Sequence, residues 1–242
     1  MPAALLVLFL AAGLRTPLLA ALALRRVRNL ALVALPYGVG LLLVPLLAQG
    51  IRVPDRAGLI AVALAPALLS GPALAARLGG RMDRAGALLL GTIVVAFALG
   101  LREGGGAAST VQAAAIAFVV GGGVTSAVPM LPAAARRGIQ WLGELAFVAI
   151  LAVGATRIDE IGPSLFATAA LFGATVLTAA IAARIGGVDL TSALLGAGTR
   201  DPAVAVAIAL AAGGSTVVPV AYAALSIVFL TVVVLVNRRK PR

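Results

Sequence analysis

Long apolar runs, separated by short polar stretches, make up nearly the whole chain. An α-helix needs about 20 mostly apolar residues to cross the hydrocarbon core of a bilayer, whereas a membrane β-barrel is built from short alternating strands. The pattern here is of the first kind and predicts an all-α integral membrane protein with about nine transmembrane helices. Because no connection is long, residues 1–242 are expected to form a single transmembrane domain. The runs cover residues 4–24, 29–49, 57–78, 84–101, 108–132, 139–156, 161–183, 188–211 and 215–236.

Two of these runs are interrupted in the same way. "LLSGPALAA" (68–76) and "GTRDPAVAV" (198–206) each contain a glycine- and proline-bearing break followed by small helix-forming residues, at an offset of 130. Pro72 and Pro202 mark the predicted helix breaks. Five runs separate the two segments, so they cross the membrane in opposite directions. The arrangement predicts a 4+5 inverted-topology repeat, with halves at about 1–104 and 107–242.

Interrupted helices at corresponding places of two inverted halves are the best pointer from sequence to a transport site near mid-membrane. A break frees backbone N–H and C=O groups, which the membrane interior tolerates only where they line a cavity or meet other protein groups. We therefore expect the site to lie between the breaks, which the sequence predicts at residues 69–73 and 197–202.

Composition changes how the charge is interpreted. The chain is 62% hydrophobic with a net charge of +11, and its mean hydropathy is +1.14. In a soluble protein this charge would suggest nucleic acid, but most basic residues here lie between apolar runs, so we expect the lipid bilayer and no nucleic acid as a partner. With the N-terminus outside, 13 basic residues fall on the cytoplasmic side and four on the outer side. The inner group is Arg25, Arg26, Arg28, Arg77, Arg81, Arg84, Arg136, Arg137, Arg184, Arg238, Arg239, Lys240 and Arg242, and the outer group is Arg52, Arg56, Arg102 and Arg157.

This bias predicts a multi-pass protein of the cell membrane, inner or plasma, with its N-terminus outside and its C-terminus in the cytoplasm. The chain contains no cysteine and no histidine. Thiolate and imidazole metal ligands, cysteine nucleophiles and histidine acid–base chemistry are therefore excluded. We expect no enzyme activity, no metal site and no cofactor.

The interrupted segments and the spans after them carry a family resemblance. "SGPALAARLGGRMDRAGALLLGTIVVAFAL" and "GAGTRDPAVAVAIALAAGGSTVVPVAYAALSIVFLTVVVLV" resemble the two crossover regions of the bile acid:sodium symporter family, over about a third of the chain. Nine spans split four plus five are similar to members that lack the first of ten helices. The resemblance implies a panel domain and a core domain in which two broken helices cross, a fold like that of sodium–proton antiporters. It also implies transport of organic anions or small metabolites, commonly driven by sodium.

The chain departs from that family at the positions that would hold sodium. The second crossover of the family usually reads Glu-Thr-Gly-x-Gln-Asn, and here Gly196, Arg200 and Asp201 stand at the Glu, Gln and Asn positions. The usual Ser-Asn pair of the first crossover falls near Pro72 and Ala73. A fixed guanidinium thus stands where a cation ligand is expected. Sodium stays open as a coupling ion, but these departures argue against sodium coupling.

Four ionisable residues lie deep in the runs, namely Arg15, Glu144, Arg200 and Asp201. A central charge costs about 2.5–3.5 kcal/mol on insertion scales, so such residues usually face a cavity or a partner. Arg200 offers an anion a planar fork, or it bonds backbone freed by the break. Asp201, just before Pro202, is placed to cap a helix or to carry a proton.

Glu144 and Arg15 can likewise be interpreted as either structural or functional residues. Glu144 lies near the inner interface and is either a partner of Arg136, Arg137 or Arg15, or a coupling carboxylate. Arg15 either pairs with Glu144 or Asp201, or lines a substrate path.

The candidate site combines the break residues with these charges. Arg200, Thr199, Gly198, Ser70 and Gly71 are the predicted substrate-binding residues. Asp201, Glu144 and Arg15 are the predicted coupling or charge-compensating residues.

The function predicted from these features is secondary active transport of a small organic anion by alternating access. One alternative is a cation/proton antiporter in which Asp201 titrates, with Arg200 depressing its pKa. The other is a non-transporting membrane sensor or scaffold of the same fold. The sequence carries no indication of oligomeric state.

Overall fold

The structure is a computed structural model that describes residues 2–16, 27–103, 105–127, 132–156 and 162–238. These residues are almost entirely helical and contain no strand, apart from one isolated β-bridge. The helices are α1 (Pro2–Arg15), α2 (Val27–Leu47), η2 (Ala48–Gly50), α3 (Val53–Leu64), α4 (Gly71–Arg77), α5 (Met82–Glu103), α6 (Gly105–Ala127), α7 (Ala133–Ala155), α8 (Gly162–Gly186), α9 (Leu190–Ala193), the π-helix η3 (Leu194–Gly198), α10 (Pro202–Ala211) and α11 (Val217–Arg238).

The predicted class, an all-α membrane protein, is confirmed. Within the described residues, five helical segments are long and apolar enough to cross a membrane, and three more apolar helices are shorter. The long ones are Leu32–Gly50, Met82–Leu99, Arg137–Ala155, Ser164–Gly186 and Val217–Val236, and the short ones are Ala3–Leu14, Val111–Val124 and Pro202–Ala211.

Both predicted interruptions exist, but the first lies earlier than expected. It covers residues 65–70 between α3 and α4, not 69–73, and Pro66 lies inside it. Pro72 instead lies in the first turn of α4, as Pro202 does in α10, where a missing N–H leaves no hydrogen bond unmade. Pro66 ends α3 because a residue before proline avoids the helical conformation, and Ala65 is extended at φ −59°, ψ 141°.

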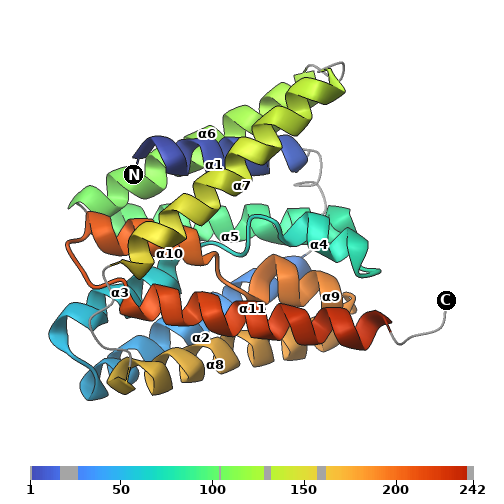
Figure 1. The fold of residues 1–242 in the computed structure, drawn as a ribbon. Coiled ribbons are helices and arrows are strands. Elements are labelled where there is room, and N and C mark those ends of the chain that lie inside the picture. Colours follow the sequence, from blue (N-terminus) through green and yellow to red (C-terminus); the bar gives the residue numbers. More distant parts are fainter. Residues whose placement is uncertain (1, 17–26, 104, 128–131, 157–161, 239–242) are drawn as a thin grey trace.

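The helices form two layers (Figure 1). α1 packs against α6 and α7, and we call these three helices the panel layer. The remaining helices form the core layer, in which α2 packs against α8, and α10 against α3 and α11. The layers meet where α5 contacts α6 and where α10 contacts α6 and α7. The two broken helices therefore lie in the core layer, and α10 faces the panel.

Glycines bring the panel helices into backbone contact. A Cβ added to Gly13 on α1 would overlap the carbonyl oxygen of Phe118 on α6, and one added to Gly121 would overlap the carbonyl oxygen of Leu10. Small residues at helix contacts allow this close approach in membranes. The panel layer is therefore a tightly packed unit.

The second halves of the two broken helices end in the same motif. Gly79 after α4 and Gly213 after α10 both have positive φ, +79° and +68°. The next residue in each case, Gly80 or Gly214, donates its N–H to a helix carbonyl five residues back, at 2.8 Å. This is the glycine-dependent cap that closes many helices, and it recurs here 134 residues apart along the chain.

Candidate functional site

The two interruptions cross each other as short extended segments. Ala67 and Arg200 form an antiparallel bridge. On either side of it, the N–H of Leu68 donates to the carbonyl oxygen of Thr199 at 3.1 Å, and the N–H of Asp201 donates to that of Pro66 at 2.8 Å. Backbone groups freed by the breaks thus bond each other, which is what a water-poor membrane interior requires.

Side chains from three neighbouring helices complete these backbone bonds. The Tyr37 hydroxyl on α2 donates to the carbonyl oxygen of Ala65 at 2.6 Å. Thr92 Oγ1 on α5 accepts the N–H of Ala67 at 3.0 Å, and the Tyr222 hydroxyl on α11 accepts the N–H of Arg200 at 3.0 Å.

Sequence reasoning missed these three side chains. The available signal was that Tyr37 and Tyr222 are the only tyrosines in the chain, and a buried tyrosine hydroxyl normally finds a hydrogen-bond partner.

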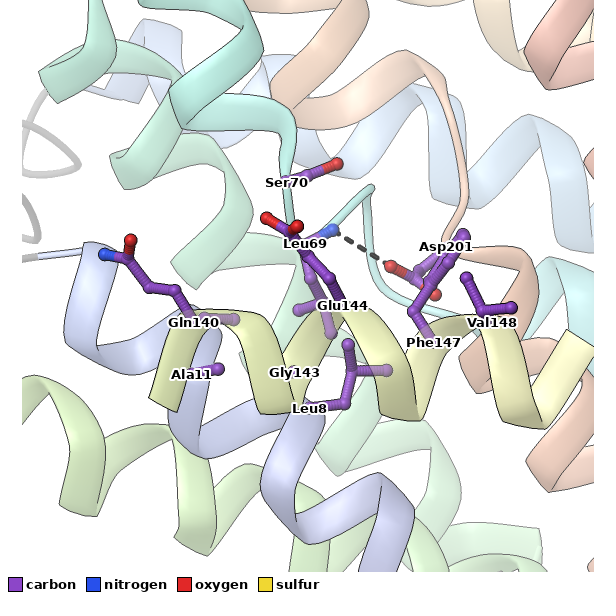
Figure 2. A pocket seen from close by; sticks show the side chains of 11 residues that line it. Leu8, Ala11, Leu69, Ser70, Gln140, Gly143, Glu144, Phe147, Val148 and Asp201 are labelled. Atoms are coloured by element: carbon purple, nitrogen blue, oxygen red, sulfur yellow. Dashed lines mark hydrogen bonds between the residues drawn. The ribbon is translucent and has the colours of Figure 1, made fainter. Parts of the chain in front are cut away.

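Asp201 caps α10 and also links the two breaks. Its Oδ1 accepts the N–H groups of Ala203 and Val204 at 3.0 and 3.1 Å, which confirms the predicted helix cap. Its Oδ2 accepts the N–H of Leu69 at 3.1 Å, from the other broken helix (Figure 2). The carboxylate therefore receives three backbone N–H groups, at the end of α10 where the helix dipole is positive.

Arg200 points away from its neighbour Asp201, because successive residues of an extended segment face opposite sides. Its side chain is fully buried, with 0% exposure, and the guanidinium carbon lies 3.6 Å from the centre of the Tyr37 ring. Within the described residues, none of its three side-chain nitrogens has a hydrogen-bond partner. The charge is thus stacked on an aromatic face while its N–H donors are unused.

A cavity of about 320 Å³ lies between the panel layer and the crossing (Figure 2). Helices α1 and α7 supply one wall, and Leu69, Ser70 and Asp201 supply the other. Its polar lining residues are Ser70, Gln140, Glu144 and Asp201, and the rest are apolar or glycine. The cavity therefore brings together three of the predicted site residues, and adds Gln140, which sequence reasoning did not identify.

The remaining predicted binding residues do not line this cavity and have packing roles. A Cβ on Gly71 would overlap the carbonyl oxygen of Leu195, and one on Gly198 would lie 2.9 Å from Ala179 Cβ. Thr199 is fully buried, and its hydroxyl donates to the carbonyl oxygen of Leu194 at 3.2 Å. These residues let α4 and α8 approach η3 closely. Arg200 is likewise not part of the lining.

Of the two coupling candidates outside the crossing, the structure describes the side chain of one and not that of the other. Glu144 is exposed on α7 and faces the cavity (Figure 2). The side chain of Arg15 lies outside the described residues, so its predicted pairing with Glu144 or Asp201 stays a prediction.

Panel and core make a tight contact beyond one end of the cavity. The Thr216 hydroxyl at the start of α11 donates to the carbonyl oxygen of Gly154, near the end of α7, at 2.7 Å. A Cβ on Gly154 would lie 3.0 Å from Val206 on α10. Cavity-lining residues of α7 end at Val148, so this helix touches the core closely at one end and borders the cavity along its middle.

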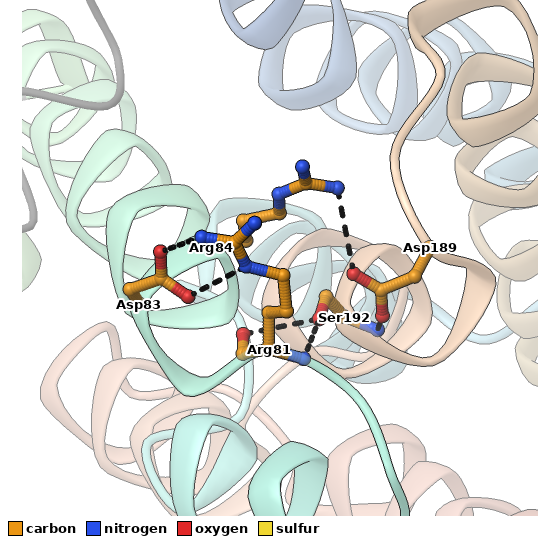
Figure 3. Close-up of polar contacts among 5 residues, drawn as sticks. All are labelled: Arg81, Asp83, Arg84, Asp189 and Ser192. Carbon is orange, nitrogen blue, oxygen red and sulfur yellow. Dashed lines mark hydrogen bonds and ion pairs between the residues drawn. The ribbon is translucent and has the colours of Figure 1, made fainter.

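A polar cluster ties the turn between α4 and α5, and the first turn of α5, to the start of α9 (Figure 3). Ser192 Oγ accepts the N–H of Arg81 at 2.8 Å and donates to its carbonyl oxygen at 3.1 Å. Asp189 caps α9 by accepting the N–H of Ser192 at 2.8 Å and lies 3.9 Å from Arg84. Asp83 pairs with Arg81 at 2.7 Å.

A second junction ties the end of α10 to the start of α3. The N–H of Ser215 donates to the carbonyl oxygen of Pro54 at 3.0 Å, and Ser164 Oγ donates to Asp55 Oδ2 at 2.7 Å. Burial alone would raise the pKa of Asp55, but hydrogen bonds from Ser164, Ser215 and Arg52 outweigh it and hold the pKa below its usual value. The start of each broken helix is therefore hydrogen-bonded to the segment that follows the other broken helix.

Among the described residues, no three His, Cys, Asp or Glu side chains gather closely enough to hold a metal ion. Comparison with known proteins finds no family model that matches this chain and no match among curated proteins.

Proposed function

We propose that this chain is a secondary active transporter that moves a small organic anion across the cell membrane by alternating access. The observation that carries the proposal is the crossing of two interrupted helices beside a cavity that panel and core layers share. Broken helices at mid-membrane are how many secondary transporters form a site without exposing free backbone to lipid.

Matched caps and helix contacts support an inverted repeat. The glycine caps after α4 and α10 recur at an offset of 134 residues, close to the 130 obtained from the sequence by aligning the prolines. The packing of α1 on α7 and of α2 on α8 agrees with a twofold relation between halves.

Transport in this scheme is a movement of the panel layer against the core layer. The panel packs internally through glycines, and the core is joined by the crossing and the two junctions, so each is suited to move as a unit. The solute would occupy the cavity, where Ser70 and Gln140 offer neutral hydrogen bonds and Leu8 and Phe147 offer apolar contact. The N-terminus is proposed to lie outside, on the charge bias alone.

An anionic substrate is supported by the positive charge of Arg200, which is buried at the crossing beside the cavity but does not line it. The test is uptake of labelled carboxylates into proteoliposomes that contain the full chain. Uptake should fall strongly for Ser70→Ala and Gln140→Ala and vanish for Arg200→Ala. Unchanged uptake in Arg200→Ala would remove Arg200 from the mechanism, and a lack of uptake of any anion by the wild type would contradict the proposal.

One observation favours a second candidate, cation/proton exchange. Two carboxylates, Glu144 and Asp201, line the cavity from opposite walls, and its described lining holds no cationic side chain. The test targets Glu144, because replacing Asp201 would also remove three backbone contacts that hold the crossing together. A pH jump that drives cation flux without organic anion, and that Glu144→Gln abolishes, would favour this function over anion transport.

A further inference from the structure

One helix of the panel layer has no counterpart in the proposed inverted repeat. The offset between the two glycine caps relates α4 to α10 and α5 to α11, and the packing of α1 on α7 and of α2 on α8 relates the helices of those pairs. Helix α6 packs against α1, α5 and α10, whose counterparts are α7, α11 and α4. Among the described helices, none packs against α7, α11 and α4 together.

The burial of α5 and α11 shows the same difference between the halves. On α5, Leu90 and Ile93 are 7% and 6% exposed, and Ile93 shares a small void with Ala115 of α6. The residues 134 positions later on α11, Ala224 and Ile227, are both exposed, Ile227 at 61%. The same face of two corresponding helices is therefore covered by α6 in one half and bare in the other.

The bare position borders the cavity. The void that α1, α6 and α10 line measures only about 10 Å³, whereas the cavity measures about 320 Å³. This cavity lies between α7, which supplies Glu144 and Val148, and Ser70, which directly precedes α4. The half that has α6 is thus filled, and the half without its counterpart holds the open space.

A helix that fills this position has to run parallel to α7. Helix α6 crosses the membrane in the same direction as α1, because three crossings lie between them, namely α2, the α3–α4 pair and α5. A second copy of α7, related to the first by an axis along the membrane normal, has the required direction. The two copies then occupy each other's open position, and such a reciprocal contact closes on itself.

The free face of α7 has the residue spacing of a paired helix. Trp141, Leu145, Val148 and Ala152 are all exposed and follow one another at intervals of four, three and four residues, and we call these four residues the α7 seam. Parallel helices pack along seams of this spacing in coiled coils and in left-handed membrane bundles. Val148 also lines the cavity, so a helix packed on the α7 seam borders the cavity.

We infer that two copies of this chain pair through the α7 seam, and that α7 of each copy closes the open side of the other copy's cavity. The inference rests on the inverted repeat of the proposed function, but it requires no transported solute. The cavity of a single chain is incomplete in this arrangement, and its missing wall comes from the second copy.

The test is cysteine cross-linking in membranes that contain the full chain, which has no cysteine of its own. Leu145→Cys places a thiol on the α7 seam, and Leu177→Cys places one on α8 at a side chain of matched exposure, 60% against 61%. Oxidation should join most Leu145→Cys chains into dimers, because seam positions of a symmetric parallel pair meet each other within reach of a disulfide. Leu177→Cys should stay monomeric. No dimer with Leu145→Cys, or equal dimer yields for the two variants, would overturn the pairing and leave this face to lipid or to another protein.

A second cross-link tests whether the paired helix fills the open position. Chains with Leu142→Cys, beside the α7 seam, and differently tagged chains with Ile227→Cys are produced together and treated with a short bismaleimide. If α7 of one copy lies against α11 of the other, mixed dimers form, whereas Leu142→Cys with Leu177→Cys should give none. Dimers joined through Leu145→Cys alone would show a pair that leaves the cavity open, and would overturn the inference.

Uptake of labelled carboxylates by the same membranes separates this inference from the proposed function. Cross-linked dimers that transport no anion would support the pairing and contradict only the transport proposal. Uptake by chains that do not cross-link at either pair of positions would contradict only the pairing.

Discussion

The Thr216 hydroxyl donates to the Gly154 carbonyl oxygen, and this bond joins the core layer to the panel layer just beyond the cavity. The Thr216 side chain is 1% exposed, and a Cβ on Gly154 would lie 3.0 Å from Val206 on α10 and 3.2 Å from Val220 on α11, so the bond lies inside a close contact of α7 with the core layer. Any movement that opens this end of the panel–core boundary must break the bond.

Thr216→Val should destabilise the form with this contact. The variant keeps the side-chain shape and removes the side-chain donor of the buried Gly154 carbonyl, at a cost of about 1 kcal/mol, the usual net value of one hydrogen bond. Thermal unfolding in detergent would measure it. Thr231→Val removes a similar bond to the carbonyl oxygen of Ile227, but on an exposed face, and should change the midpoint little. Equal midpoint shifts in the two variants would contradict the assignment of the Thr216 bond as a buried interlayer contact.

Asp201→Ala should be among the most destabilising single changes at the crossing. Loss of a helix cap costs about 1 kcal/mol, and the unsatisfied N–H of Leu69 adds about 1–3 kcal/mol. Asp189→Ala at the start of α9 removes a cap with one bond at a partly exposed site and serves as the comparison. Unfolding midpoints of the two variants give the measurement, and a larger drop for Asp189→Ala would show that the link to Leu69 contributes nothing.

Gly121→Val should prevent the panel layer from assembling, because a Cβ there overlaps the backbone of α1. Relief of that overlap requires α1 and α6 to separate along their packed length. Gly123→Val, on the same helix, meets nothing within 4 Å and should leave the fold intact. Size-exclusion profiles of the two variants in detergent would compare them, and a monodisperse, wild-type-like Gly121→Val would contradict the observed contact.

Asp55 should make stability depend on pH in the acid range. Its pKa is lowered in the folded protein, so the stability it contributes is fully present above the ordinary aspartate value, near 4, and is lost as the pH falls through the lower folded value. Asp55→Asn should therefore be less stable than the wild type at pH 7, and the gap should narrow below pH 4. Unfolding midpoints across pH 2.5–7 would test this, and a constant gap would exclude the linkage.

The sequence predicted the helices and the existence of both breaks because glycine, proline and apolar length act locally. It could not locate the first break exactly, since Pro66 competes with Gly71 and Pro72 as a signal and only packing decides between them. The opposite directions in which the Arg200 and Asp201 side chains point depend on backbone pairing with residues more than 130 positions away. The Tyr37 contact comes from yet another helix, so no local pattern around residue 200 could indicate it.

The bridge between Ala67 and Arg200 has a consequence for biosynthesis. When the third apolar run leaves the ribosome, the carbonyl of Pro66 and the N–H of Leu68 lack the partners that they have in the finished protein. Those partners are translated more than 130 residues later, and lipid offers no substitute. The crossing can therefore form only after the second broken helix has been made, so the first break reaches its final contacts late in biosynthesis.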